Sequence, residues 1–407
     1  MKRLACLILT LALLLSCVAF SVSAADRNVL PFTDADQINH YADCAILYDL
    51  GVISGNPDGT FNPGRNVTRA EAAVMACRLL DITVYGGVCK AADIYKGHWA
   101  ESYIAYVVDM GMMTLSPDGR FQPNLAVTVR DFCRTMLRLL GYENVTDSRI
   151  ESLIEQTNLL SGFEKGLDQF ITRDDCCLLL YNAASCYQIE RWVDGKPIYY
   201  TDALLNPTSL FEHRFGLIRY TELLTANEYA DLNLHDGHLE KGYTKIAEHR
   251  AFNVSTGLEY VGRRVDIFVK DDEVVGLPHV HTDETCLSFK DYLTYEAFMF
   301  NNGFSVGAET QYYFNYQLSD RYCLIGEYDR SEIICVDSNN DRVFDLVLVV
   351  ACEEAKFTSA VPVRIEFPDG TKELIPGEHV IYGEVKEGDT VYVVCVSGIW
   401  HIFSENE

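Results

Sequence analysis

The sequence predicts a multidomain α + β protein, in which an all-α repeat region is followed by a β-rich region. Two observations support this fold class. A pair of helical segments recurs after 60 residues in the first half, as the matching Gly51 and Gly111 illustrate. Short strand patterns separated by turns dominate after about residue 260. A length of 407 residues is enough for two or three domains of ~150 residues each.

The chain is strongly acidic. It has 33 Lys and Arg against 59 Asp and Glu, which gives a formal net charge of −26. A surface of this sign repels polyanions, so nucleic acid and an anionic membrane face are excluded as bulk partners. The hydrophobic share of 48% is sufficient for packed cores and argues against a disordered chain.

The N-terminus has the pattern of an export signal. Lys2 and Arg3 precede an apolar run over residues 4–20, and small residues follow at 21–25. This pattern predicts a signal peptide over residues 1–24, with no transmembrane anchor left after cleavage. Two alternatives are an uncleaved membrane anchor and a lipoprotein, in which Cys17 would carry the lipid.

Three repeats follow the signal, at residues 31–85, 86–145 and 146–190. The first two align without gaps through a helix ending in Gly, a Pro-Asp-Gly turn and a Val-Thr pair. The third is degenerate: it is shorter, lacks the turn, and has Asn158 where the other two have Gly51 and Gly111. Asn is the next best residue for the left-handed conformation that ends a helix, so the replacement supports the alignment.

Each repeat is predicted to fold as helix, loop, helix. The first helix of repeat one has an apolar face with a spacing of four residues, formed by Ile38, Ala42, Ile46 and Leu50. The second helix begins with a capping box, because Thr68 is followed three residues later by Glu71. The same spacing recurs as Thr128 with Asp131 and Thr172 with Asp175.

Arg69 stands in the first turn of such a helix, where a cation opposes the helix dipole. One interpretation is a solvated side chain that tolerates the small cost. The other is an anion site, in which free backbone N–H groups and the guanidinium together hold a carboxylate. Arg173 has the same place in repeat three, whereas repeat two has Val129 there.

The tandem motifs resemble the S-layer homology domain, most closely at His98-Trp99-Ala100, Pro57–Phe61 and Thr68–Glu71. The resemblance covers about residues 31–184. It implies three copies arranged as a pseudo-threefold helical domain on a secreted bacterial protein of the cell wall or S-layer surface. It also implies non-covalent binding to a secondary cell-wall polysaccharide, which often carries pyruvate ketals.

The resemblance also indicates which residues would bind the wall polymer. The arginines of the family motif correspond to Arg69 and Arg173, and the aromatic at the start of the first helix corresponds to Trp99. The expected polymer-binding set is therefore Arg69, Arg173, Trp99, Tyr41, Thr68 and Glu71, with Tyr41 as the weaker counterpart of Trp99 in repeat one. Repeat two lacks the aligned Arg, and repeat three lacks the aromatic start, so at most two sites are complete.

The second half changes character. Residues 191–260 show no strong period and are expected to form a mixed connecting region. Residues 261–407 are predicted to form a β-rich domain, as a small barrel or a sandwich. The strand signals there include hairpins over residues 361–375 and 380–396, each with a Gly-containing turn.

One loop of this region could hold calcium. Oxygen-bearing side chains stand at positions 1, 3, 5 and 9 of the segment, as Asp337, Asn339, Asp341 and Asp345. The alternative is a polar hairpin loop in which Asp and Asn provide turn geometry. No other cofactor is suggested by the sequence.

No catalytic signature stands out, since a nucleophile elbow, a His-Glu-x-x-His zinc motif and a phosphate loop are all missing from the sequence. The main hypothesis is therefore a non-catalytic, wall-anchored surface protein whose β-rich half is an interaction or structural module. The alternative is a wall-tethered glycan hydrolase with its site in residues 191–407. The cysteines outside the signal are expected to be buried thiols in preference to a disulfide framework.

Overall fold

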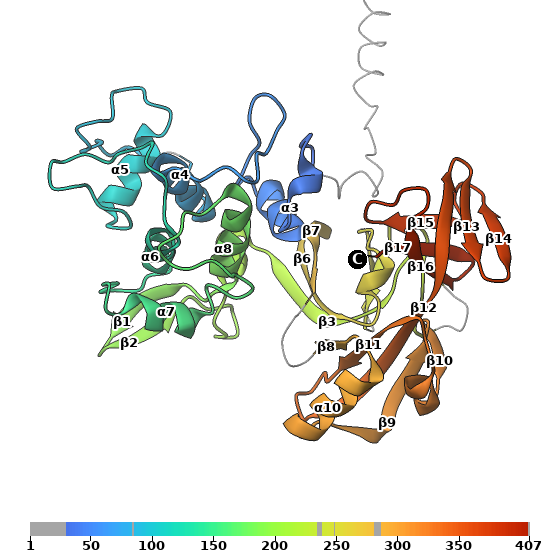
Figure 1. Cartoon of the computed structure of the whole chain (residues 1–407). Helices are drawn as coiled ribbons and strands as arrows, with labels where there is room; N and C mark the ends of the chain where they lie inside the picture. Colours follow the sequence, from blue (N-terminus) through green and yellow to red (C-terminus); the bar gives the residue numbers. More distant parts are fainter. Residues whose placement is uncertain (1–29, 84, 234–237, 248, 281–285, 406–407) are drawn as a thin grey trace, which may run out of the picture.

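The computed structural model describes residues 30–83, 85–233, 238–247, 249–280 and 286–405 (Figure 1). The expected signal peptide, residues 1–24, and the lipidation candidate Cys17 lie outside these residues. Within the part of the chain that the structure describes, every helix is too short or too polar to span a bilayer.

The N-terminal part consists of three pairs of α-helices, one pair for each predicted repeat. The pairs are α3 (Tyr41–Asp49) with α4 (Arg69–Leu79), α5 (Glu101–Asp109) with α6 (Val129–Leu139), and α7 (Ile150–Thr157) with α8 (Arg173–Ser185). A short 3₁₀ helix, η1 (Ala35–Gln37), precedes them. The first helix of each pair is followed by a left-handed residue, namely Gly51, Gly111 or Asn158, as the sequence predicted.

The three pairs form a closed ring. The first helix of each repeat packs on the second helix of the preceding one, so that α5 contacts α4, α7 contacts α6, and α3 contacts α8. Three backbone hydrogen bonds close the same ring at its centre: Val67 N–H donates to Ile171 O (3.0 Å), Ile171 N–H to Val127 O (3.1 Å), and Val127 N–H to Val67 O (2.9 Å). This cyclic bonding defines a pseudo-threefold axis, which agrees with the arrangement that the sequence resemblance implied.

A short hairpin and a helix follow the ring. The hairpin is β1 (Ile189–Val193) with β2 (Lys196–Tyr199), and the helix is α9 (Leu210–Phe215). The indole N–H of Trp192 donates to the carbonyl of Gly141 at 2.9 Å and so attaches the hairpin to the end of repeat two.

The next unit is a five-stranded sheet with the order β5-β4-β3-β6-β7. Its strands are β3 (Ile218–Ala226), β4 (Thr244–Ile246), β5 (Ala251–Phe252), β6 (Arg264–Lys270) and β7 (Glu273–Val280), and η2 (Leu258–Tyr260) lies between β5 and β6. This sheet draws strands from both sides of the boundary expected at residues 260/261. We therefore propose that the β-rich region begins with β3.

A ten-stranded sheet contains the rest of the strands. They are β8 (Cys286–Phe289), β9 (Ser305–Phe314), β10 (Gln317–Ser319), β11 (Arg330–Val336), β12 (Val343–Ala360), β13 (Val363–Phe367), β14 (Gly370–Leu374), β15 (His379–Tyr382), β16 (Thr390–Val396) and β17 (Ile399–Ser404). The long strand β12 is central, because it pairs with β9, β11, β13 and β16. The helices α10 (Tyr292–Asn302) and η3 (Arg321–Ile325) flank this sheet.

The two sheets pack together in a sandwich-like manner. One buried cluster joins Leu224 and Val265 of the five-stranded sheet to Ile334 and Leu348 of the ten-stranded sheet. Another cluster lies between the ten-stranded sheet and α10. The strands that the structure describes form open paths, so the barrel alternative is not found.

The helical ring and the β-rich region meet along α3 and β7, which lie side by side in Figure 1. Gly276 of β7 has a φ of +70°, and a Cβ atom there would lie 2.5 Å from Cβ of Ile46. The ring of His279 stacks on that of Tyr181 at a centroid distance of 3.9 Å, and its Nε2 lies 3.0 Å from Oδ1 of Asp43. Helix α3 is therefore shared, since it contacts α8 on the ring side and β7 on the β side.

A candidate ligand groove among the three repeats

Arg173 links repeat three to the loop of repeat one. Its Nε donates to the carbonyl of Phe61 and its Nη2 to the carbonyl of Ser54, both at 2.7 Å, and its guanidinium lies 4.4 Å from the centre of the Phe61 ring. Only 9% of Arg173 is exposed. Burial lowers the pKa of Arg173, but a guanidinium stays protonated in a protein. The site therefore holds a fixed positive charge.

Arg69 makes the same contacts one repeat further on. Its Nε donates to the carbonyl of Phe121 (2.7 Å) and its Nη2 to that of Thr114 (2.8 Å), while its guanidinium lies 4.7 Å from the Phe121 ring centre. In repeat two the equivalent helix position is the buried Val129. Its neighbour Arg130 instead forms surface ion pairs with acids of repeat three.

The prediction that these helix N-termini have free N–H groups is wrong. In α4 the first two N–H groups, of Arg69 and Ala70, donate to carbonyls of repeat two at 2.9 and 3.0 Å. In α8 the N–H groups of Arg173 and Asp174 donate to carbonyls of repeat one at the same two distances. Carbonyls of the neighbouring repeat thus already accept hydrogen bonds from these N–H groups, so an anion bound here would depend on side chains.

A cavity of about 150 Å³ lies beside Arg173. Residues of all three repeats line it: the loop and α4 belong to repeat one, Trp99 to repeat two and Arg173 to repeat three. Its polar and aromatic lining comprises Ser54, Asn56, Phe61, Glu71, Arg78, Trp99 and Arg173. Trp99 stacks on His98, with 5.7 Å between ring centres, and remains 60% exposed. The ring therefore brings together three of the predicted site residues, Arg173, Trp99 and Glu71, in a single groove, which we call the Arg173 groove.

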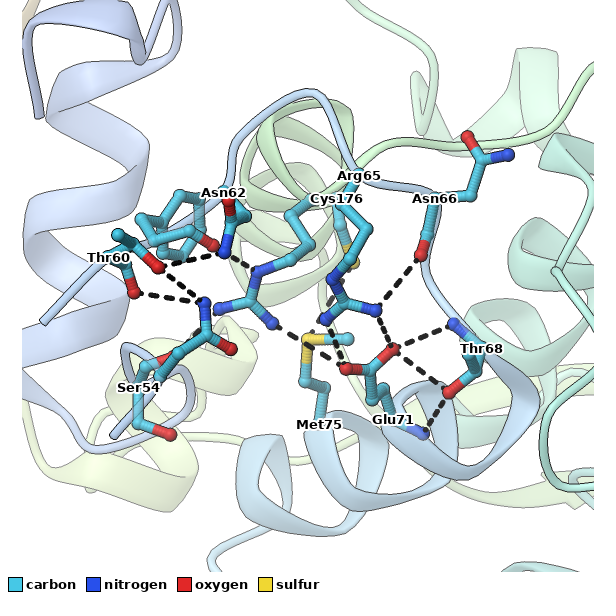
Figure 2. Close-up of polar contacts among 12 residues, drawn as sticks. Ser54, Thr60, Asn62, Arg65, Asn66, Thr68, Glu71, Met75 and Cys176 are labelled. Atoms are coloured by element: carbon cyan, nitrogen blue, oxygen red, sulfur yellow. Dashed lines mark hydrogen bonds and ion pairs between the residues drawn. The ribbon is translucent and has the colours of Figure 1, made fainter. Parts of the chain in front are cut away.

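Glu71 belongs to a network that fixes the start of α4 (Figure 2). Its carboxylate accepts from the N–H and hydroxyl of Thr68 at 2.9 Å each, and it forms an ion pair with Arg65. Although burial acts to raise it, the hydrogen bonds from Arg65 and Thr68 lower the pKa of Glu71. Because Arg65 neutralises Glu71, the cations Arg78 and Arg173 dominate the charge of the groove.

The equivalent place beside Arg69 is built differently. Sixty residues after Gly55 stands Leu115, which packs against the core. The counterpart of Val74 is Arg134, which forms ion pairs with Asp131 and Asp147. Larger side chains therefore occupy the positions that are small in repeat one, and the Arg173 groove is the better candidate site.

Tyr41 does not have the position expected of it. It begins α3 just as Glu101 begins α5, so the positional counterpart of Trp99 in repeat one is Asn39. The Asn39 amide Nδ2 donates to Oδ2 of Asp174 at 2.8 Å, which is a contact between repeats one and three. We therefore leave Tyr41 out of the candidate site.

Sequence reasoning missed the carboxylates that hold the repeat loops. Asp34 accepts from the N–H groups of Phe61 and Asn62, both at 2.7 Å, and so fixes the loop that carries the Phe61 carbonyl. Asp93 holds the loop of repeat two in the same way. An Asp before the first helix in both repeats is the sequence signal that could have revealed this role.

The residues predicted to bind calcium, in the loop between β11 and β12, accept hydrogen bonds from the backbone of that loop. Asp337 accepts from the N–H groups of Asp341 and Arg342, at 3.2 and 2.8 Å, and Asp341 accepts from Val343 at 2.8 Å. Oxygens of Asn339 and Asp345 bond to N–H groups of the same loop. Among the residues that the structure describes there is no group of three or more His, Cys, Asp or Glu able to hold a metal ion. These hydrogen bonds are the ones that a polar turn requires, and calcium binding stays a prediction.

A second cavity, of about 680 Å³, lies where α8 and the β1–β2 hairpin meet the five-stranded sheet. Two carboxylates line it, those of Asp43 and Asp266. Each already has a partner, His279 for Asp43 and the hydroxyl of Thr221 for Asp266. Asp43 also lies outside residues 191–407, where the hydrolase alternative placed its site.

Comparison with known proteins agrees with this architecture. Residues 31–73 and 92–128 match the S-layer homology domain family, within the first and second repeats. The first two repeats of the helical ring therefore contain S-layer homology domains. The chain carries S-layer homology domains and is similar to cell-surface proteins, so the predicted resemblance and the cell-surface location are confirmed.

Relatives include surface proteins of several bacteria. The chain is 24% identical over 283 residues to a cell surface protein of Thermoanaerobacter kivui, a match that covers 66% of this chain and 34% of the relative. It is 32% identical over 113 residues to the cellulosome-anchoring protein of Acetivibrio thermocellus (26% and 25%). It is 31% identical over 140 residues to the surface-layer 125 kDa protein of Lysinibacillus sphaericus (34% and 11%). In each case the matched segment is about a third or less of the relative's length.

Proposed function

We propose that the helical ring holds this cell-surface protein non-covalently to an anionic secondary cell-wall polysaccharide through the Arg173 groove. The β-rich region is then displayed as an interaction or structural module. The observation that supports this function best is that Arg173 and Trp99, which belong to different repeats, line one cavity. The pair depends on the assembled ring, because neither repeat alone provides both side chains.

The chemistry of the groove suits an acidic sugar. The guanidinium of Arg173 uses Nε and Nη2 on backbone carbonyls, and its Nη1 lies 4.0 Å from Oε1 of the already paired Glu71. Its other N–H bonds can be donated to a carboxylate, such as that of a pyruvate ketal. The exposed indole of Trp99 offers a flat apolar surface to a sugar ring.

The net charge of the chain limits how this binding works. An excess of acidic residues repels a polyanion at long range, so attraction has to come from a few placed cations. Binding should therefore be local and sensitive to single substitutions at the groove. It should also weaken with added salt less than binding by a broad basic surface would.

Co-sedimentation of the full chain with purified wall sacculi tests this function. We expect the wild-type chain to sediment with sacculi and to be released when the sacculi are chemically depyruvylated. Trp99→Ala should lose most of the retention with little change in stability. Phe170→Ala is the matched control, because Phe170 is also exposed (50%) but lies outside the groove. Equal retention of the two variants, or no retention of wild type, would contradict the proposal.

A further inference from the structure

The second cavity lies between the helical ring and the β-rich region, and we call it the interface cavity. Its volume of about 680 Å³ falls in the range of about 300–1,000 Å³ that is typical of small-ligand sites. Its walls include the end of α7 with the loop after it, the second half of α8, the β1–β2 hairpin and the five-stranded sheet. Among the described residues, none lines both this cavity and the Arg173 groove. The two sites are therefore distinct.

Tyrosine rings form much of the lining. Within the part of the chain that the structure describes, the tyrosines that line the cavity are Tyr142, Tyr181, Tyr187 and Tyr199. The rings of Tyr187 and Tyr199 meet edge to face, with 5.8 Å between their centres. Tyr187 is 45% exposed, so a ligand can reach its ring from solvent. Such rings offer flat apolar surfaces with a polar rim, which suit the C–H faces of sugar rings.

The β1–β2 hairpin holds the two tyrosines in place. Tyr187 lies just before β1 and forms an isolated bridge with Ser209, while Tyr199 ends β2. The N–H of Ile189 donates to the carbonyl of Leu140 at 2.9 Å, which fastens the hairpin to the end of repeat two. A platform that is already fixed loses little conformational freedom when a ligand binds.

Amide and hydroxyl groups lie beside these rings in the lining. The Nδ2 of Asn182 donates to the carbonyls of Leu159 at 3.1 Å and Ser161 at 2.9 Å, which fixes the amide and leaves its Oδ1 as an acceptor. The hydroxyl of Thr157 donates to carbonyls of its own helix, so its lone pairs can accept as well. The tyrosine hydroxyls and the side-chain amide of Asn158 provide donors. A ligand rich in hydroxyl groups, each of which donates and accepts, matches this mixture.

The charged side chains of the interface cavity do not favour an anion. Asp43 and Asp266 contribute two carboxylates, whereas Arg219 contributes one guanidinium. Even if His279 is protonated, the positive charges only equal the negative ones. Cations are thus not in excess among the described lining residues, in contrast to the Arg173 groove, and an uncharged ligand fits this balance better.

We propose that the interface cavity binds an uncharged oligosaccharide. A sugar ring stacks on Tyr187 and Tyr199, and its hydroxyl groups form hydrogen bonds with Asn182 and Thr157. This site takes neutral sugars, whereas the function proposed above requires an acidic sugar in the Arg173 groove. The two proposals depend on different residues and can fail separately.

A ligand in this cavity would contact both halves of the protein. Asn182 and the two tyrosines lie on the side of the ring, while Arg219 and His279 belong to the five-stranded sheet. A ligand that binds only when the two sides are packed together stabilises that packing by mass action. Oligosaccharide binding should therefore strengthen the junction between α3 and β7.

Isothermal titration calorimetry of the full chain with cellotriose, maltotriose and triacetylchitotriose tests the proposal. We expect at least one of these neutral trisaccharides to bind with a Kd of about 1 mM or tighter. Tyr187→Ala should weaken that binding by about tenfold or more, whereas Tyr187→Phe should keep it because the ring face remains. Tyr243→Ala is the matched control, since Tyr243 is also exposed (38%) but lies outside the cavity.

Three results would overturn the proposal. One is that none of the three trisaccharides binds, and another is that Tyr187→Ala binds as tightly as wild type. The third is that Trp99→Ala abolishes the binding, because this would place the sugar in the Arg173 groove. If Tyr187→Ala fails to fold, hydrogen exchange of the wild-type chain decides: the trisaccharide should slow exchange in the β1–β2 hairpin, and unchanged exchange there would contradict the site.

Discussion

The backbone N–H of Gly276 donates a hydrogen bond to the Asp49 carboxylate at 2.9 Å, across the junction between β7 and α3. Burial raises the pKa of Asp49, while this hydrogen bond acts in the opposite direction. The contact requires the strand to approach the helix closely, which a side chain at position 276 would prevent. The anchoring ring and the β-rich region are therefore joined by packing as well as by the chain.

Gly276→Ala should loosen this junction. The new Cβ would lie 2.5 Å from Cβ of Ile46, and the φ of +70° is unfavourable for alanine. We expect a loss of about 3 kcal/mol or more in unfolding free energy. Gly303→Ala is the matched control, because Gly303 has the same φ but open space around it, and it should lose only about 1 kcal/mol.

Denaturant unfolding gives both values, and calorimetry shows whether the junction variant separates into two transitions. Equal losses for the two glycine variants would mean that backbone conformation, and not packing against α3, explains why glycine is needed at position 276.

Arg173→Lys and Arg69→Lys should have similar effects on stability but different effects on wall binding. A lysine cannot reproduce two hydrogen bonds from one planar group, so each variant should lose about 2 kcal/mol of unfolding free energy. Retention on wall sacculi should fall sharply for Arg173→Lys only, because larger side chains occupy the equivalent place beside Arg69. The measurements are urea unfolding and co-sedimentation. If both variants lose retention equally, either both places bind the wall polymer or the loss of stability explains the loss of retention.

Asp174→Ala should weaken the seam between repeats one and three. The carboxylate of Asp174 is buried and accepts three hydrogen bonds, from the backbone of Asn39 and His40 and from the Asn39 amide. It thereby fixes the backbone just before α3, whose own N-cap residue, His40, makes no side-chain cap. The expected loss is about 2 kcal/mol in unfolding free energy. Asp168→Ala, at an exposed acid on the same repeat, should change the value by less than about 0.5 kcal/mol.

Local chemistry explains which parts of the fold could be predicted. The capping boxes at Thr68 and Thr172 and the left-handed helix ends at Gly51 and Asn158 depend on residues a few positions apart, and all are present in the structure. The motif of the S-layer homology domain likewise consists of residues a few positions apart. These features do not depend on how the repeats meet.

The groove and the junction depend on how distant segments meet. One interpretation of Arg69 assumed free N–H groups at the start of α4, yet the N–H of Arg69 donates to the carbonyl of Leu125 in the next repeat. Ser54 and Arg78 join Trp99 in one cavity only after the ring closes. The same holds for Gly276, whose need for glycine arises from Ile46 of the first repeat.

His401 predicts a pH dependence of stability in the β-rich region. It is fully buried, its Nδ1 lies 2.8 Å from the hydroxyl of Tyr382, and its Nε2 lacks a partner among the described residues. Burial lowers the pKa of His401 to about 4. The facing rings, those of Tyr382 and Tyr229, have a pKa raised by burial and do not titrate in acid.

The direction of this pH dependence follows from proton binding by the folded and unfolded chains. The unfolded chain takes up a proton at His401 below about pH 6.5, whereas the folded chain resists it until about pH 4. The contribution of His401 to the free energy of unfolding is therefore fully present above pH 6.5 and is lost as the pH falls toward 4. It amounts to about 3 kcal/mol. His401→Gln should be less stable at pH 7 but should lose less on acidification, as urea unfolding from pH 7 to pH 4 would show. Parallel curves for the two proteins would exclude His401 as the titrating group.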